Sequence, residues 1–118
     1  MPSVLIVDDD SDLLEMVALA LSTHGFTTTS ITDGKTFIDT VSTVKPDIIL
    51  LDIFLGDIDG RRLCQNLKTE TLYKNIPVIL YSAGNISMSS IGESEANAFI
   101  PKPFNIKQLT EKISSLLT

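Results

Sequence analysis

The sequence is poor in several residue types and patterns that mark large classes of protein. Only one of its 118 residues is cysteine, Cys64, which excludes an internal disulfide and argues against a zinc cluster. Basic residues number 9 against 15 acidic ones, and the formal net charge of −6 disfavours binding to nucleic acid or to an anionic membrane through bulk charge. No apolar run approaches the roughly 20 residues of a membrane span. Residues 1–3 carry none of the basic charge of a secretory signal, so we expect a cytoplasmic protein without membrane contact.

What the chain does contain is enough apolar material for a folded core. Hydrophobic residues make up 43% of the sequence and charged residues 20%, which is not the composition of a disordered segment. The length fits one domain of ordinary size, and no linker, repeat or low-complexity stretch divides it. We therefore expect a single domain over residues 1–118.

Short apolar runs alternate with amphipathic segments of helical length. Three runs are continuously apolar, as strands covered on both faces are, and two shorter or more polar runs suit positions nearer the sheet edges. The expected strands are residues 4–7, 26–31, 47–52, 76–82 and 98–101. Apolar residues at helical spacing predict helices after Ser11, over residues 37–44 and 60–70, and from Asn105 onward, with a weaker, short helix within 83–97.

Local signals mark the ends of these helices. Ser11 is expected to cap the first helix, and Asp10 to favour the same end through the helix dipole. Asn105 and Gln108 have the spacing of a capping box. Residues 53–59 are expected to form a loop, in which Asp57 and Asp59 suit a turn.

Strands that alternate with helices predict an α/β fold, a doubly wound five-stranded parallel sheet with helices on both faces. In such sheets, sites form beyond the carboxyl ends of the strands. Four of the five expected strands end on a polar residue or cluster. These residues are Asp8, Asp9 and Asp10 after the first strand, Asp52 after the third, Ser82 after the fourth and Lys102 after the fifth.

The types of these residues suggest a common chemistry. Carboxylates held close together repel one another, and a hard divalent cation such as Mg²⁺, which prefers oxygen ligands, relieves that repulsion. A carboxylate is also a nucleophile that can form an acyl phosphate. The metal and a lysine can stabilise the negative charge of a phosphoryl group in transfer. The set indicates an aspartyl-phosphate site.

Four motifs give the chain a specific resemblance. IVDDD (6–10), LLDIFLGDIDG (50–60), LYSAG (80–84) and FIPKPF (99–104) resemble, in order and spacing, the receiver domain of bacterial two-component response regulators. The resemblance covers the chain from end to end. It implies the flavodoxin-like strand order 2-1-3-4-5 for the five strands.

The resemblance also implies a role for each matching residue. Asp52 is the implied phosphoacceptor, and Lys102 pairs with the phosphoryl group. Asp9 binds Mg²⁺ directly together with Asp52 and the backbone carbonyl of Phe54, while Asp8 assists through water. Ser82 then moves toward the phosphate and Phe99 rotates behind it, so that these two residues form the switch.

The implied partners follow from the same resemblance. A sensor histidine kinase or a histidine phosphotransfer protein supplies the phosphoryl group, and a downstream protein effector reads the result. The domain itself makes no direct contact with nucleic acid, and it is a monomer or a phosphorylation-dependent dimer. Its chemistry is limited to phosphorylation and dephosphorylation of its own aspartate, so we do not expect an enzyme in the ordinary sense.

Some positions depart from the family pattern. Gly56 stands where proline is usual, and the switch residue is Phe99 rather than the common tyrosine. Phe54 is bulky and Gly84 is minimal at two positions that in the family influence how easily water reaches the phosphate. Our hypothesis is that Phe54 partly shields the acyl phosphate.

Other functions remain open from the residues alone. A phosphotransferase or phosphatase with an aspartyl nucleophile would need extra loops to shield its substrate. A flavin-binding module would need a Ser-, Thr- or Gly-rich loop where Asp8, Asp9 and Asp10 stand. A receiver used only for docking would not need the intact set of site residues. The chain could also be a stand-alone receiver or a domain excised from a larger DNA-binding regulator or hybrid kinase.

Overall fold

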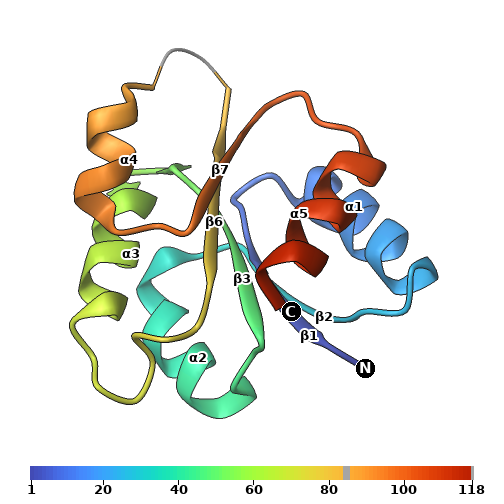
Figure 1. The fold of residues 1–118 in the computed structure, drawn as a ribbon, viewed down its shortest axis with the longest axis horizontal. Coiled ribbons are helices and arrows are strands. Elements are labelled where there is room, and N and C mark those ends of the chain that lie inside the picture. The colour runs from blue at the N-terminus through green and yellow to red at the C-terminus, as the bar shows by residue number, and fades with distance from the viewer. Residues whose placement is uncertain (84–85, 118) are drawn as a thin grey trace.

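The computed structural model describes residues 1–83 and 86–117. At the centre lies a parallel sheet of five strands in the order β2-β1-β3-β6-β7 (Figure 1). The strands are β1 (Ser3–Val7), β2 (Thr27–Ile31), β3 (Ile48–Asp52), β6 (Val78–Ser82) and β7 (Ala98–Pro101). In chain order these are the five expected strands, so the predicted doubly wound sheet and its order 2-1-3-4-5 are confirmed.

Five helices cover the two faces of the sheet, as the alternating pattern predicts. They are α1 (Ser11–Thr23), α2 (Phe37–Val44), which a 3₁₀ turn η1 (Gly34–Thr36) precedes, α3 (Gly60–Lys68), α4 (Met88–Ser94) and α5 (Ile106–Leu117). Figure 1 shows α1 and α5 on one face and α2, α3 and α4 on the other. Within the described residues, none of these helices has the length and apolar character needed to cross a bilayer.

Two hydrophobic cores result, one on each face. Successive residues of β1 alternate between them: Val4 and Ile6 pack with α1 and α5, whereas Leu5 and Val7 pack with α2 and α3. The strands β1, β3 and β6 are buried on both faces, which accounts for their continuous apolar sequences. Because neither face meets water, the carboxyl ends of these three strands are held in fixed relative positions.

The start of α1 differs from the sequence expectation. Asp10, not Ser11, is the N-cap residue, and its side chain accepts hydrogen bonds from the backbone N–H groups of Asp12 (3.1 Å) and Leu13 (3.2 Å). Ser11 is the first residue of the helix itself. At the other end of the chain, Asn105 Oδ1 accepts from the backbone N–H of Gln108 at 2.6 Å, so half of the expected capping box is present.

The expected loop over residues 53–59 is an ordered hairpin. Its two short strands, β4 (Phe54–Leu55) and β5 (Ile58–Asp59), pair antiparallel. Gly56 lies in the turn with φ +65°, a conformation closed to proline, whose ring fixes φ near −65°. Glycine at this position therefore suits the turn that this chain forms. Asp59 ends the hairpin and caps α3 by accepting from the backbone N–H of Arg61 at 2.9 Å.

The N-terminus of α3 packs directly on the end of β3. The backbone N–H of Gly60 donates to the carbonyl of Ile53 at 2.7 Å. A Cβ atom added at Gly60 would overlap the carbonyl oxygen of Asp52. Only glycine allows this close approach, which fixes the backbone of Asp52 at the carboxyl edge of the sheet.

We predict that Gly60→Ala destabilises the protein by about 1–3 kcal/mol, because the new methyl group meets backbone atoms that cannot move aside cheaply. Urea unfolding measures the change. Gly92→Ala in α4 is the matched control, since a Cβ there meets no atom within 4 Å. The control should stabilise the helix by about 0.5–1 kcal/mol. Equal stabilities for both variants would show that α3 does not press on β3.

Candidate functional site

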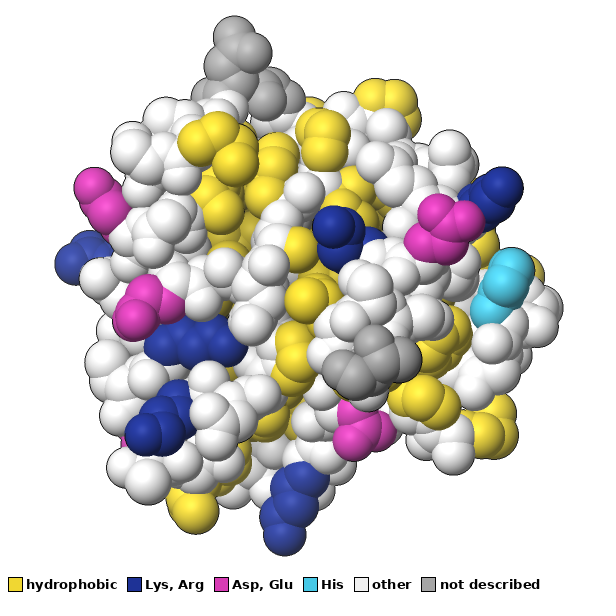
Figure 2. Space-filling view, in the orientation of Figure 1, with side chains coloured by type: hydrophobic (Ala, Val, Ile, Leu, Met, Phe, Trp, Pro, Cys, Tyr) yellow, Lys and Arg dark blue, Asp and Glu magenta, His cyan; other side chains and the backbone are white. Residues whose placement is uncertain are grey.

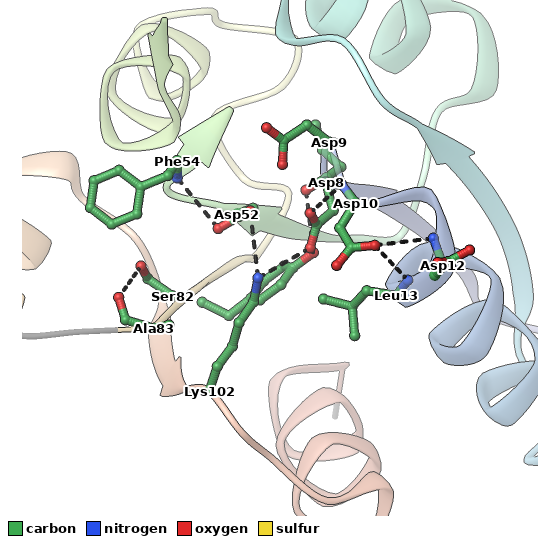
Figure 3. Close-up of polar contacts among 12 residues, drawn as sticks. Asp8, Asp9, Asp10, Asp12, Leu13, Asp52, Phe54, Ser82, Ala83 and Lys102 are labelled. Atoms are coloured by element: carbon green, nitrogen blue, oxygen red, sulfur yellow. Dashed lines mark hydrogen bonds and ion pairs between the residues drawn. The ribbon is translucent and has the colours of Figure 1, made fainter. Parts of the chain in front are cut away.

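Charged side chains from three strand ends meet at the carboxyl edge of the sheet (Figure 3). Asp8 and Asp9 follow β1, Asp52 is the last residue of β3, and Lys102 follows β7. One oxygen from each of the three carboxylates lies within 4.8 Å of the others. The structure thus brings together four residues that are up to 94 positions apart in the chain.

Asp8 is completely buried, and protein donors hold both of its oxygens. Oδ1 accepts from the backbone N–H of Asp10 at 2.9 Å. Oδ2 accepts from the hydroxyl of Tyr81 at 2.6 Å and from Lys102 Nζ at 3.3 Å. A charged carboxylate without solvent needs such partners, because an unpaired buried charge is very costly.

Asp52 lies beside Asp8 and is 4% exposed. Its Oδ1 accepts from the backbone N–H of Phe54 at 3.3 Å, and its Oδ2 lies 3.6 Å from Lys102 Nζ. Burial and then the negative charge of Asp8 raise the pKa of Asp52 to about 6, although the ammonium of Lys102 acts in the opposite direction. The Asp52 carboxyl group is therefore harder to ionise than that of an exposed aspartate.

Asp9 is the exposed member of the group. Its Oδ2 accepts from the backbone N–H of Gly56 at 3.2 Å, which ties the end of β1 to the hairpin turn. Figure 3 shows its carboxylate above those of Asp8 and Asp52, on the side away from Lys102. Asp9 thus lies on the solvent-facing side of the acidic group.

The three other predicted site residues lie around this group in different settings. Ser82 is buried, and its hydroxyl donates to the carbonyl of Ala83 at 2.9 Å. Phe99 is half-buried and packs against the core beneath α2, α3 and α4. The Phe54 ring is 54% exposed and points away from the carboxylates in Figure 3. Gly84 lies outside the described residues.

Tyr81 is a member of the site that the sequence analysis missed. It is 1% exposed on β6, and burial and the hydrogen bond to Asp8 raise the pKa of its hydroxyl, so the group stays protonated and donates. A tyrosine inside an otherwise apolar buried strand was the available signal, because a buried hydroxyl requires a partner.

The side chains present fit a small divalent cation. Three carboxylates supply only oxygen donors, which Mg²⁺ prefers, and their mutual repulsion is only partly offset by one ammonium. The exposed position of Asp9 leaves an open side on which a hydrated ion could keep its waters. The donor set is therefore chemically suited to Mg²⁺.

Comparison with known proteins now gives the class of this chain. The family model for the response regulator receiver domain matches residues 4–114, so the chain belongs to that family. It is a receiver domain of two-component response regulators, as the resemblance implies.

Three relatives illustrate the match. The DNA-binding response regulator MtrA of Mycolicibacterium paratuberculosis is 32% identical over 97% of this chain. A crystal structure from Chloroflexus aurantiacus is 31% identical with a TM-score of 0.92, over 99% of this chain and 98% of that one. The receiver domain of a histidine kinase from Syntrophus aciditrophicus is 28% identical with a TM-score of 0.88, over 99% and 90% of the two chains. The chain spans about half the length of the curated relatives it matches, 50% in the case of MtrA.

The raised pKa of Asp52 predicts how stability depends on pH. An acid whose pKa rises from 3.8 to about 6 on folding favours the folded state below pH 3.8 and loses that contribution as pH rises through 6. At pH 8, without divalent metal, Asp52→Asn should therefore be more stable than wild type by roughly 3 kcal/mol. Urea unfolding in EDTA between pH 5 and 8 measures this, and Asp39→Asn, at an exposed position of α2, is the control. A constant difference between Asp52→Asn and wild type across this range would contradict the prediction.

Proposed function

We propose that the domain is a phosphorylation-dependent switch in which Asp52 accepts the phosphoryl group. The observation that carries this proposal is the Asp52 carboxylate, buried and 3.6 Å from the Lys102 ammonium, with oxygens of Asp8 and Asp9 within 4.8 Å. An Asp52 oxygen attacks phosphorus, a P–O bond forms, and the P–N bond of a phosphohistidine breaks. The imidazole of the donor keeps the electron pair of that bond. Water later hydrolyses the acyl phosphate and restores the carboxylate.

The surrounding side chains have separate tasks in this proposal. Lys102 pairs with the phosphoryl oxygens from its place between Asp8 and Asp52. The hydroxyl of Ser82 leaves the Ala83 carbonyl and donates to the phosphate. Phe99 then rotates into the space behind it, and the surface formed by α4, β7 and α5 changes its preferred partner. Phosphorylation acts by shifting the equilibrium between two such states.

Mg²⁺ is the proposed cofactor. Asp9, Asp52 and the Phe54 carbonyl would hold it, and Asp8 would assist through water. When bound, Mg²⁺ offsets the repulsion among the carboxylates and stabilises negative charge on the phosphoryl group. The support for this assignment is the all-oxygen donor set of the site.

The proposed donor is a sensor histidine kinase or a histidine phosphotransfer protein, and the output passes to a protein effector. We propose residues 1–118 as one receiver domain that acts in the cytoplasm, as a monomer or a phosphorylation-dependent dimer. The same switch could serve alone or within a larger regulator, such as relatives of the DNA-binding MtrA type. We propose no enzymatic substrate other than the domain's own aspartate.

Acetyl phosphate tests the central claim. Incubated with acetyl phosphate and Mg²⁺, the wild-type chain should gain the mass of one phosphoryl group, and Asp52→Asn should gain none, because it lacks the nucleophile. Intact-mass spectrometry measures both. Asp57→Asn in the hairpin turn is the control for a neighbouring exposed carboxylate.

Two results would overturn the assignment: no gain of mass by wild type, or an equal gain by Asp52→Asn. Removing Mg²⁺ or introducing Asp9→Asn should slow the gain without removing the nucleophile. If neither change alters the rate of phosphorylation, the metal assignment is wrong, while Asp52 can still be the phosphoacceptor.

A second prediction concerns the lifetime of the acyl phosphate. Phe54 stands two residues past Asp52, and its ring points away from the carboxylates in the absence of a phosphoryl group. We propose that the ring limits the approach of water once the phosphoryl group is attached. Phe54→Asn removes the ring and supplies an amide that can orient water, so dephosphorylation should become several-fold faster. Loss of the phosphoryl mass after removal of acetyl phosphate measures the rate. Leu72→Asn, at another exposed apolar side chain, is the control, and equal rates for both variants would contradict the shielding role.

A further inference from the structure

Tyr81 reaches across the sheet to the acidic site. It lies on β6, while Asp8 follows β1, and β3 runs between these two strands. The Tyr81 hydroxyl donates to Asp8 Oδ2 at 2.6 Å and lies 3.4 Å from the carbonyl of Val7. The carboxylate makes the shorter of these two contacts.

The ring of Tyr81 is held in place from two sides. Phe104 meets it edge to face, with the ring centroids 5.8 Å apart and the planes at 86°. Lys102 Nζ lies 4.8 Å from the centroid, a favourable distance for a cation over an aromatic face. With the ring fixed, the direction of the hydroxyl toward Asp8 is fixed as well.

We propose that Tyr81 is a positioning residue that orients the Asp8 carboxylate for the metal site. The inference rests on the Mg²⁺ site of the proposed function and adds a residue that this function does not assign. Tyr81 supplies the shortest hydrogen bond to Asp8, and it approaches the same oxygen as Lys102. It thereby holds the Asp8 carboxylate in one orientation, so that Lys102 is not the only partner of that oxygen.

The sign of the effect follows from the burial of Asp8. Because this carboxylate is 0% exposed, water cannot replace a lost donor. Without the Tyr81 hydroxyl, Lys102 can close from 3.3 Å onto Asp8 Oδ2 and turn the carboxylate away from the water through which it would assist the cation. Metal binding should therefore weaken. Hydrogen-bond partners of metal-site residues commonly change metal affinity by about 10- to 100-fold.

Tyr81→Phe tests the proposal because it removes the hydroxyl and keeps the ring. Calorimetric titration with Mg²⁺, without any phosphoryl donor, should give a Kd about tenfold above wild type. Tyr73→Phe is the matched control, since Tyr73 is a half-buried tyrosine that packs against the other core. Its Kd should equal that of wild type. A wild-type Kd in Tyr81→Phe would overturn the proposal, even if the variant were less stable.

A second measurement separates positioning from a general loss of structure. With acetyl phosphate at saturating Mg²⁺, Tyr81→Phe should regain a rate close to wild type, because only the binding of the metal is impaired. A rate that stays low at all Mg²⁺ concentrations would contradict positioning through the metal site. Wild type that binds Mg²⁺ but gains no phosphoryl mass would instead refute the proposed function and leave the role of Tyr81 intact.

Discussion

The central constraint on the site is the electrostatic repulsion between two buried carboxylates, Asp8 and Asp52, which the Lys102 ammonium offsets only in part. Both carboxylates lie almost wholly out of solvent, and the ammonium stands 3.3 Å from one and 3.6 Å from the other. Burial, and then the charge of Asp8, raises the pKa of Asp52 to about 6 despite the opposing effect of Lys102. A folded chain keeps such an arrangement only if the rest of the molecule holds the charges together, and the resulting site favours any ligand that adds positive charge.

The sheet supplies that constraint. β1 and β3 are adjacent and parallel, so their carboxyl ends place Asp8 and Asp52 side by side, while β7 at the edge returns Lys102 to the same rim. Burial on both faces keeps the inner strands from shifting. Short backbone contacts then fix the surroundings: Gly60 packs on the end of β3, and the backbone N–H of Gly56 donates to Asp9. Figure 2 shows apolar side chains between the charged ones on the face that it draws.

The sequence predicted the fold correctly because its pattern of apolar residues excluded most other folds. Continuous apolar runs with helical segments between them allow few folds other than a parallel sheet, and that topology alone predicts which residues meet. Sequence failed where two residues had the same propensity, since Asp10 and Ser11 are both good caps and only the structure shows that Asp10 binds the helix N–H groups. Strands of two residues have no periodicity, so the hairpin of β4 and β5 left no signal. Tyr81 was missed because the apolar pattern of its strand marks it as a core residue, and the sequence does not show which group its buried hydroxyl contacts.

The end of β6 connects the two faces of the domain. Tyr81 turns toward the core of α1 and α5 and holds Asp8, whereas its neighbour Leu80 packs in the opposite core and pairs in register with Phe99 of β7. The next residue, Ser82, accepts at its carbonyl from the backbone N–H of Lys102 at 2.8 Å. In the proposed switch, a displacement of Ser82 toward a phosphoryl group would therefore act on Lys102 through this backbone hydrogen bond. Because strand residues alternate between faces, this short segment contacts the acidic site on one side and the core beneath α2, α3 and α4 on the other.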